Sequence, residues 1–107
     1  MAFSETWTAL QTELVARPII PNWTVHSGAI GDPFKVIVAT SDVVMVDPPG
    51  AESPKRVYRK DFQRVYESWH EYCHCGMLRK EFESLWRSKY VISILHWLES
   101  QLGGKLP

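Results

Sequence analysis

The chain has 107 residues, and its 12 basic side chains are balanced by 12 acidic ones. This length fits one domain, which we place at residues 1–107, and a hydrophobic content of 45% is too high for a disordered chain. The absence of net charge removes a bulk electrostatic drive toward nucleic acid or anionic membranes, and it does not oppose association between copies.

Apolar runs in the sequence are short, and the longest, such as Val36–Ala39, have four residues. A membrane span needs about 20 apolar residues. The N-terminal residues have neither the basic start nor the apolar core of a secretory signal. Cys73 and Cys75 are too close in sequence for an unstrained disulfide. We therefore expect a cytoplasmic protein with reduced thiols.

The first half of the chain predicts one helix followed by strands. An apolar stripe with helical spacing predicts a helix at about residues 4–16, which Pro18 ends. Residues 23–26 read as a short strand, and residues 34–40 and 43–47 read as an antiparallel hairpin. In this hairpin, strict alternation places Phe34, Val36 and Val38 on one face.

The second half predicts one more strand and then three helices. We place the strand at 56–59, with Val57 or Tyr58 pointing inward, and the helices at 60–75, 78–86 and 88–102. Gly76 and the pair Gly103–Gly104 are suited to end helices. The expected fold is α+β, with a small antiparallel sheet of three to four strands packed against an N-terminal helix and three C-terminal helices.

Aromatic residues are numerous, with five tryptophans, four tyrosines and four phenylalanines. The last predicted helix carries a second apolar stripe, formed by Tyr90, Ile94 and Trp97, beside its main one. A helix that is apolar over so wide an arc is buried from two sides, either as a central helix or at an oligomer contact. This stripe, together with Trp86, predicts a homodimer interface.

A basic segment spans residues 55–64 and offers an alternative site for an anion or a nucleic acid. Its candidate contact residues are Arg56, Arg59, Lys60 and Arg64. The competing explanation is that these side chains pair with the acidic residues Asp42, Asp47 and Glu52. Residues 78–102 also resemble a helix-turn-helix in outline, but the last helix is poor in side chains that read base edges.

A second alternative is a small-molecule pocket lined by Trp23, His26 and Tyr58, if the sheet leaves a cleft. His70 and His74 are one helical turn apart, but the nearby cysteines cannot both join them around a zinc ion. The sequence therefore predicts no metal site and no cofactor, and it nominates no catalytic residue.

Three segments carry a resemblance to known proteins: Val57–Phe62, the pair Trp69 and Tyr72, and Ser88–Leu95. They are similar to short uncharacterised bacterial proteins, including some that mobile integron gene cassettes encode. Those proteins are accessory and often oligomeric. The resemblance implies a soluble bacterial protein and transfers no functional residue.

These observations together favour a binding protein over an enzyme. The leading hypothesis is an accessory protein that acts as a homodimer through apolar and aromatic contacts. Weak binding of nucleic acid or anions, and binding of a small molecule in an aromatic pocket, are the two alternatives.

Overall fold

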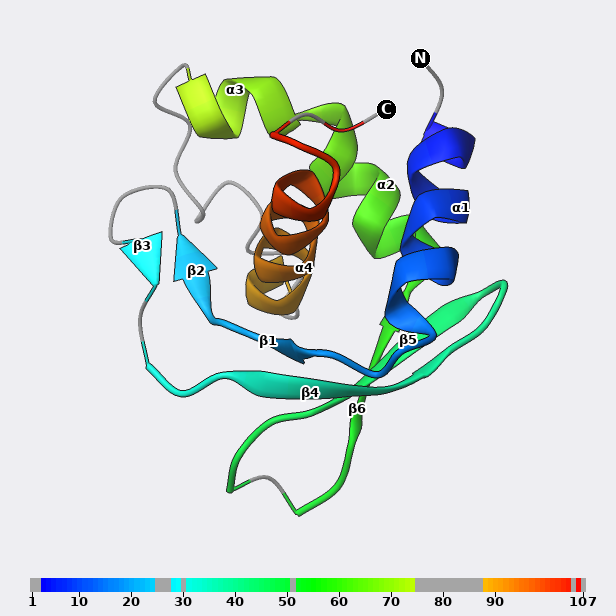
Figure 1. Cartoon of the computed structure of the whole chain (residues 1–107), viewed down its shortest axis with the longest axis vertical. Coiled ribbons are helices and arrows are strands. Elements are labelled where there is room, and N and C mark those ends of the chain that lie inside the picture. Colours follow the sequence, from blue (N-terminus) through cyan, green and yellow to red (C-terminus); the bar gives the residue numbers. More distant parts are fainter. Residues whose placement is uncertain are drawn as a thin grey trace.

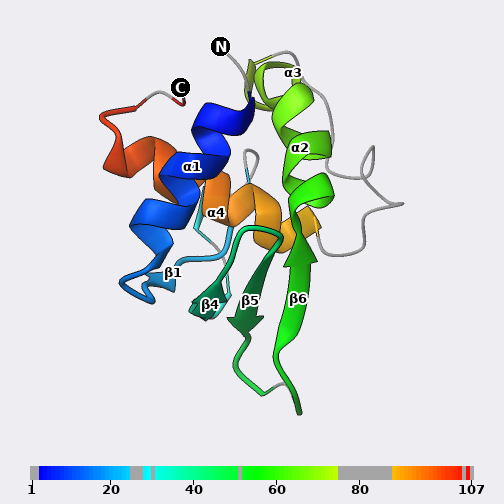
Figure 2. The same ribbon diagram turned by 90° about the vertical axis from the view of Figure 1, so that its right-hand side faces the viewer.

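The helices lie on one side of an antiparallel sheet in the computed structural model, which describes residues 3–24, 28–29, 31–50, 52–74, 88–104 and 106. Figures 1 and 2 show the four described helices above the sheet. The elements in chain order are α1 (Phe3–Leu14), β1 (Ile19–Ile20), β2 (Trp23–Thr24), β3 (Gly28–Ala29), β4 (Phe34–Ala39), β5 (Val43–Asp47), β6 (Lys55–Tyr58), α2 (Arg59–Glu67), α3 (Trp69–His74) and α4 (Ser88–Gln101). This arrangement confirms the predicted α+β class.

Helix α1 forms because its apolar residues recur every three or four positions, and it buries that stripe against the rest of the core. Its predicted range of 4–16 is close to the observed Phe3–Leu14. Arg17 has a φ of 53° and donates its N–H to the carbonyl of Leu14, which closes the helix before Pro18. A hydrogen bond joins this helix to the turn between β4 and β5: Trp7 Nε1 donates to the carbonyl of Ser41 at 3.0 Å.

Four strands form the main sheet in the order β1-β4-β5-β6, and every neighbouring pair is antiparallel. The predicted hairpin of residues 34–40 and 43–47 is confirmed as β4 and β5. Strands β2 and β3 pair separately as a two-stranded sheet. Of the predicted strand at 23–26, Trp23 and Thr24 form β2, and Val25 and His26 lie outside the described residues.

An irregularity in β4 overturns the predicted alternation of its side chains. Val36 pairs with Val46 and Val38 pairs with Met45, so one residue of β4 has no partner between them. Such a bulge reverses which side chains face inward beyond it. Phe34 and Val36 are therefore buried as expected, but Val38 is exposed.

Strand β6 and helices α2 and α3 cover nearly the same residues as the predicted strand at 56–59 and the predicted helix at 60–75. Val57 is the inward residue of β6, and Tyr58 is exposed at its end. The predicted helix at 60–75 is divided at Ser68, whose φ of −112° and ψ of 13° leave the helical region. Serine competes for backbone hydrogen bonds and so weakens a helix interior. Residues Cys75 and Gly76 lie outside the described part of the chain.

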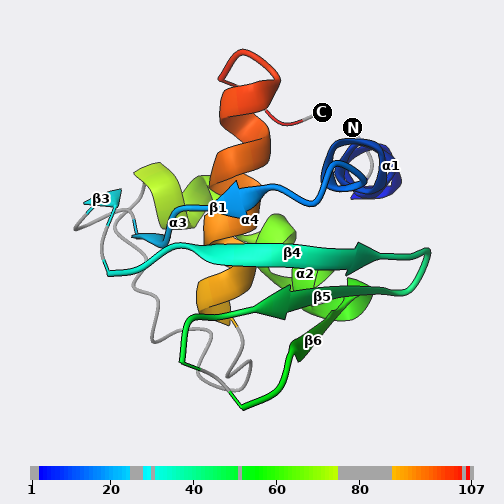
Figure 3. The same ribbon diagram turned by 60° about the horizontal axis from the view of Figure 1, so that its bottom comes forward.

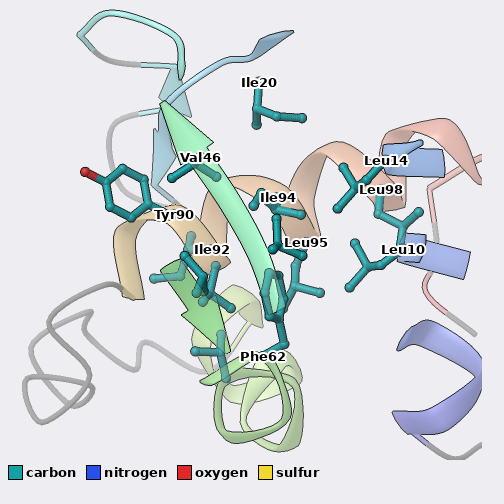
Figure 4. Packing of buried hydrophobic residues seen from close by; sticks show 14 of the residues in the cluster. Leu10, Leu14, Ile20, Val46, Phe62, Tyr90, Ile92, Ile94, Leu95 and Leu98 are labelled. Carbon is teal, nitrogen blue, oxygen red and sulfur yellow. The ribbon is translucent and has the colours of Figure 1, made fainter. Parts of the chain in front are cut away.

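Helix α4 is the centre of the core, which Figure 4 shows from close by. It is packed by the sheet on one side and by α1 and α2 on another, so nearly all its positions from Ser88 to Leu95 are buried. It ends as predicted: the N–H of Gly104 donates to the carbonyl of Glu99 at 2.7 Å, and Gly103 has a φ of 85°. The predicted helix at 78–86 lies outside the described residues.

The face of the sheet turned away from the helices has no cover from another described element, as Figure 3 shows. Its side chains include Lys35 and Asp47 in one cross-strand row and Met45 beside Arg56 in the next. None of the described helices has the length and apolar character that a membrane crossing requires.

Candidate functional site

A cleft of about 510 Å³ lies beside the C-terminal tail, where the end of α2, α3 and the end of α4 come together. We call it the tail cleft. Its lining residues are Tyr66, Glu67, Trp69, His70, His74, Glu99, Gly104 and Leu106. They include aromatic surface, two carboxylates and two imidazoles, so the cleft combines an apolar wall with several polar groups.

The back of the tail cleft is held by a hydrogen bond between α3 and α4. Trp69 is buried, and its Nε1–H donates to Oε2 of Glu99 at 3.1 Å. Glu99 stands near the C-terminal end of α4, where the helix dipole disfavours a negative charge. The indole N–H offsets part of this cost. Leu106 is also buried and lines the same cleft.

The charge of Glu99 acts on the groups around the cleft. Burial raises the pKa of the Cys73 thiol to about 11, and the Glu99 carboxylate adds to this rise. Burial lowers the pKa of His96, and the same carboxylate opposes that shift. Because nucleophilic cysteines act as thiolates, Cys73 remains an inert thiol at neutral pH.

The two histidines of α3 stand at the rim. His70 and His74 are exposed, and their ring centroids are 5.0 Å apart. A zinc site needs three or four protein ligands. In the described ranges of the chain, no three His, Cys, Asp or Glu side chains converge to hold an ion. The two rings are instead placed to donate or accept hydrogen bonds at the cleft opening.

An aromatic stack extends from this site to the small sheet. The ring of His96 lies flat on Trp23, with centroids 3.8 Å apart and an interplanar angle of 4°. Trp23 in turn lies 6.5 Å from Trp69, centroid to centroid. The backbone N–H of Trp23 donates to Oγ of Ser93, which joins β2 to α4.

The stacked position of His96 predicts a pH-dependent stability. Its pKa is lowered from 6.5 in the folded chain because burial disfavours the imidazolium. The unfolded chain therefore binds more protons below about pH 6.5, and the free energy of unfolding falls as the pH drops through that range. Urea denaturation between pH 7.5 and pH 5 would measure it. The variant H96F keeps a flat ring but has no titratable group, so its profile should be flatter; identical profiles would contradict the assignment.

The structure describes two residues of the predicted pocket, Trp23 and Tyr58, and places them in different sheets. Trp23 belongs to the two-stranded sheet and packs on α4, whereas Tyr58 ends β6 in the four-stranded sheet. His26 lies outside the described residues. Neither Trp23 nor Tyr58 lines the tail cleft.

The predicted interface stripe is core in the folded chain. Ile94 is fully buried, and Tyr90 is buried with its ring edge-on to Phe34 at 5.2 Å. These two side chains have no surface left for a second copy, because the sheet and the helices of their own chain already cover α4. Trp97 is half-buried against the core, and Trp86 lies outside the described residues.

Arg56, Arg59 and the pair Lys60 and Arg64 lie on different parts of the fold. Arg56 stands on the uncovered face of the sheet, across from Met45. The guanidinium of Arg59 instead lies 5.7 Å from the ring centroid of Phe3 and 5.9 Å from that of Trp7. It packs as a cation on aromatic rings that belong to α1.

Lys60 and Arg64 are exposed on α2, one turn apart, and Nη1 of Arg64 donates to Oγ of Ser68 at 3.0 Å. The start of α2 already has a carboxylate, since Asp61 is buried there and accepts the N–H of Tyr58 at 3.0 Å. The structure thus spreads the basic segment over several surfaces. Binding of nucleic acid by these residues stays a hypothesis.

Comparisons with protein-family models, with curated proteins and with solved structures find no match to this chain.

The tail cleft was missed by the sequence analysis, although parts of it were noticed. The stripe through Trp69 and Tyr72 and the spacing of His70 and His74 place these residues on one helical segment. Glu99 and Leu106 gave no signal in the sequence. Glu99 has the pattern of an exposed acidic residue on a helix, and Leu106 follows the glycines that end this helix. Only the packing of α4 against α3 shows that they share a site.

Proposed function

We propose that this protein is a small binding protein that holds a small organic molecule in the tail cleft. The observation that carries the proposal is the cleft itself, with a buried indole and a half-buried carboxylate at its back. Ligand sites are typically concave, partly aromatic and supplied with a few convergent polar groups, and they measure about 300–1,000 Å³. The cleft volume of about 510 Å³ falls in this range.

The residues in and near the tail cleft favour non-covalent binding of a ligand over covalent catalysis. Cys73, the one described thiol near the cleft, has a pKa of about 11 and is not a nucleophile at neutral pH. The carboxylates and imidazoles supply acceptors and donors that orient a ligand. This proposal keeps the class of binding protein that the sequence favoured and moves its site to new residues.

Filling the cleft should abolish binding. His70 is exposed at the rim, so H70W adds a bulky ring there with little expected cost to folding. We expect small-molecule fragments to shift the indole N–H signal of Trp69 in a two-dimensional ¹H–¹⁵N NMR spectrum. Their affinity should fall at least about tenfold in H70W, a loss of about 1.4 kcal/mol.

The matched control is Q63W, which adds the same ring at an exposed position of α2 outside the cleft. Fragment binding to Q63W should equal binding to the unaltered chain. Fragments that shift no signal of the cleft, or that bind H70W and the unaltered chain equally, would reject the proposed site.

A homo-oligomer remains a second candidate, and a different surface now favours it. Val15 is 76% exposed, and Ile19 and Val38 are also exposed. Val15 and Val38 line one shallow hollow of about 190 Å³ between the end of α1 and β4. Apolar side chains grouped in this way are typical of contact surfaces, and zero net charge does not oppose association.

A further inference from the structure

The tail cleft has two carboxylates, and the described part of the chain pairs neither of them with a cation. Glu99 Oε2 accepts the indole N–H of Trp69, and Glu67 is exposed at the opening. An ionised carboxylate has about four acceptor positions. Within the described residues, the indole N–H of Trp69 takes one of these positions on Glu99, and the others are open to donors that come from the cleft.

A half-buried carboxylate is costly unless charge or hydrogen bonds compensate for its lost hydration. The Glu99 carboxylate acts on two neighbouring groups: it adds to the rise in the pKa of Cys73 and opposes the lowering of the pKa of His96. Within the described residues its compensation comes from one neutral donor. A cation with several N–H groups would complete it.

Aromatic surface stands beside these carboxylates. Tyr66 and Trp69 line the cleft together with Glu67 and Glu99. Cations bind favourably on the faces of such rings, and most strongly on tryptophan. Elsewhere in the same chain the Arg59 guanidinium already lies over Phe3 and Trp7. The tail cleft has aromatic lining residues and, in addition, two carboxylates.

We infer that the ligand of the tail cleft carries an ammonium or guanidinium group, which binds Glu99 and Glu67 against the rings of Tyr66 and Trp69. This inference rests on the proposed function and specifies its ligand class. His70 and His74 serve as hydrogen-bond partners at the rim. They do not make the cleft a metal site, because no three ligating side chains converge among the described residues.

Three probes of nearly equal size and different charge test the inference: benzylammonium, benzyl alcohol and benzoate. Calorimetric titration of the full chain should show benzylammonium binding about tenfold or more tightly than benzyl alcohol, the effect of one charge-assisted hydrogen bond. Benzoate should bind more weakly still, since it meets two carboxylates. Added salt should weaken benzylammonium and leave benzyl alcohol nearly unchanged.

The variant E99Q removes one charge, while its amide oxygen still accepts the indole N–H of Trp69. It should remove most of the preference for benzylammonium. The control E52Q removes the same charge from an exposed loop residue before β6, which does not line the cleft. It should leave the preference for benzylammonium unchanged. If E99Q does not fold, E67Q tests the same point at an exposed position, with a smaller expected loss.

The outcomes separate the inference from the function on which it rests. If all three probes bind equally and H70W blocks them, the cleft is a binding site, and the cationic ligand class is wrong. Tighter binding of benzoate than of benzylammonium also overturns the ligand class and assigns an anion to the rim histidines. If no probe and no fragment binds, both the inference and the proposed function fail.

Discussion

An Ile94→Ala variant is expected to lose about 2–5 kcal/mol of unfolding free energy, and to lose it equally at every protein concentration. Ile94 is fully buried in the folded chain, so its truncation leaves a cavity that the surrounding side chains fill only in part. A residue at a contact between copies would behave differently, because its cost would appear only where the protein associates. Urea denaturation at two concentrations that differ about a hundredfold distinguishes the two cases.

The control for this measurement is Leu102→Ala. Leu102 is exposed beyond the end of α4, so its truncation should change the unfolding free energy by no more than about 0.5 kcal/mol. Light scattering of the unaltered chain gives its mass over the same concentrations. A loss in Ile94→Ala that disappears on dilution, together with a dimer mass, would return Ile94 to the interface that the sequence suggested.

Helices α1 and α4 were predictable because each one satisfies a local rule. Phe3, Trp7, Leu10 and Leu14 form one stripe of α1, and all four are buried in the structure. The wide apolar arc of α4 correctly indicated burial from two sides. It did not indicate what covers the second side, since sequence periodicity does not distinguish a neighbouring segment of the same chain from another copy.

Strand β1 and the irregularity in β4 were not predictable. Strand β1 has two residues and exists because Ile19 and Ile20 pair with the start of β4. The bulge in β4 depends on its register with β5, and strict alternation along β4 alone therefore placed Val38 on the wrong face. Strand β1 and the bulge depend on partners that are distant in sequence, so local propensity gives no signal for them.

The candidate site was the least predictable feature for the same reason. Trp69 and Glu99 are joined by a hydrogen bond across 30 positions of sequence, and nothing in either neighbourhood indicates the other. The basic segment shows the opposite effect, because residues that are close in sequence point to different surfaces. Arg56 belongs to the uncovered sheet face, whereas Arg59 packs on the rings of α1.

Ser93→Ala should weaken the attachment of the two-stranded sheet, β2 and β3, to α4. Ser93 is buried, and its Oγ accepts the N–H of Trp23 at 2.9 Å and donates to the carbonyl of Lys89 at 2.9 Å. Alanine removes the acceptor and leaves the Trp23 N–H without this partner. The expected cost is about 1–3 kcal/mol of unfolding free energy, the usual effect of an unsatisfied buried donor.

Ser100→Ala is the matched control, because Ser100 lies on the same helix and donates to the carbonyl of His96 at 3.2 Å while remaining exposed. Its cost should stay within about 0.5 kcal/mol. Hydrogen exchange at the Trp23 amide should accelerate in Ser93→Ala alone, since that bond holds β2 on α4. The stack of Trp23 on His96 depends on the same attachment, so Ser93→Ala should also weaken the pH dependence assigned to His96. Equal costs for the two alanine variants, with unchanged exchange at Trp23, would show that the stack holds β2 in place without Ser93.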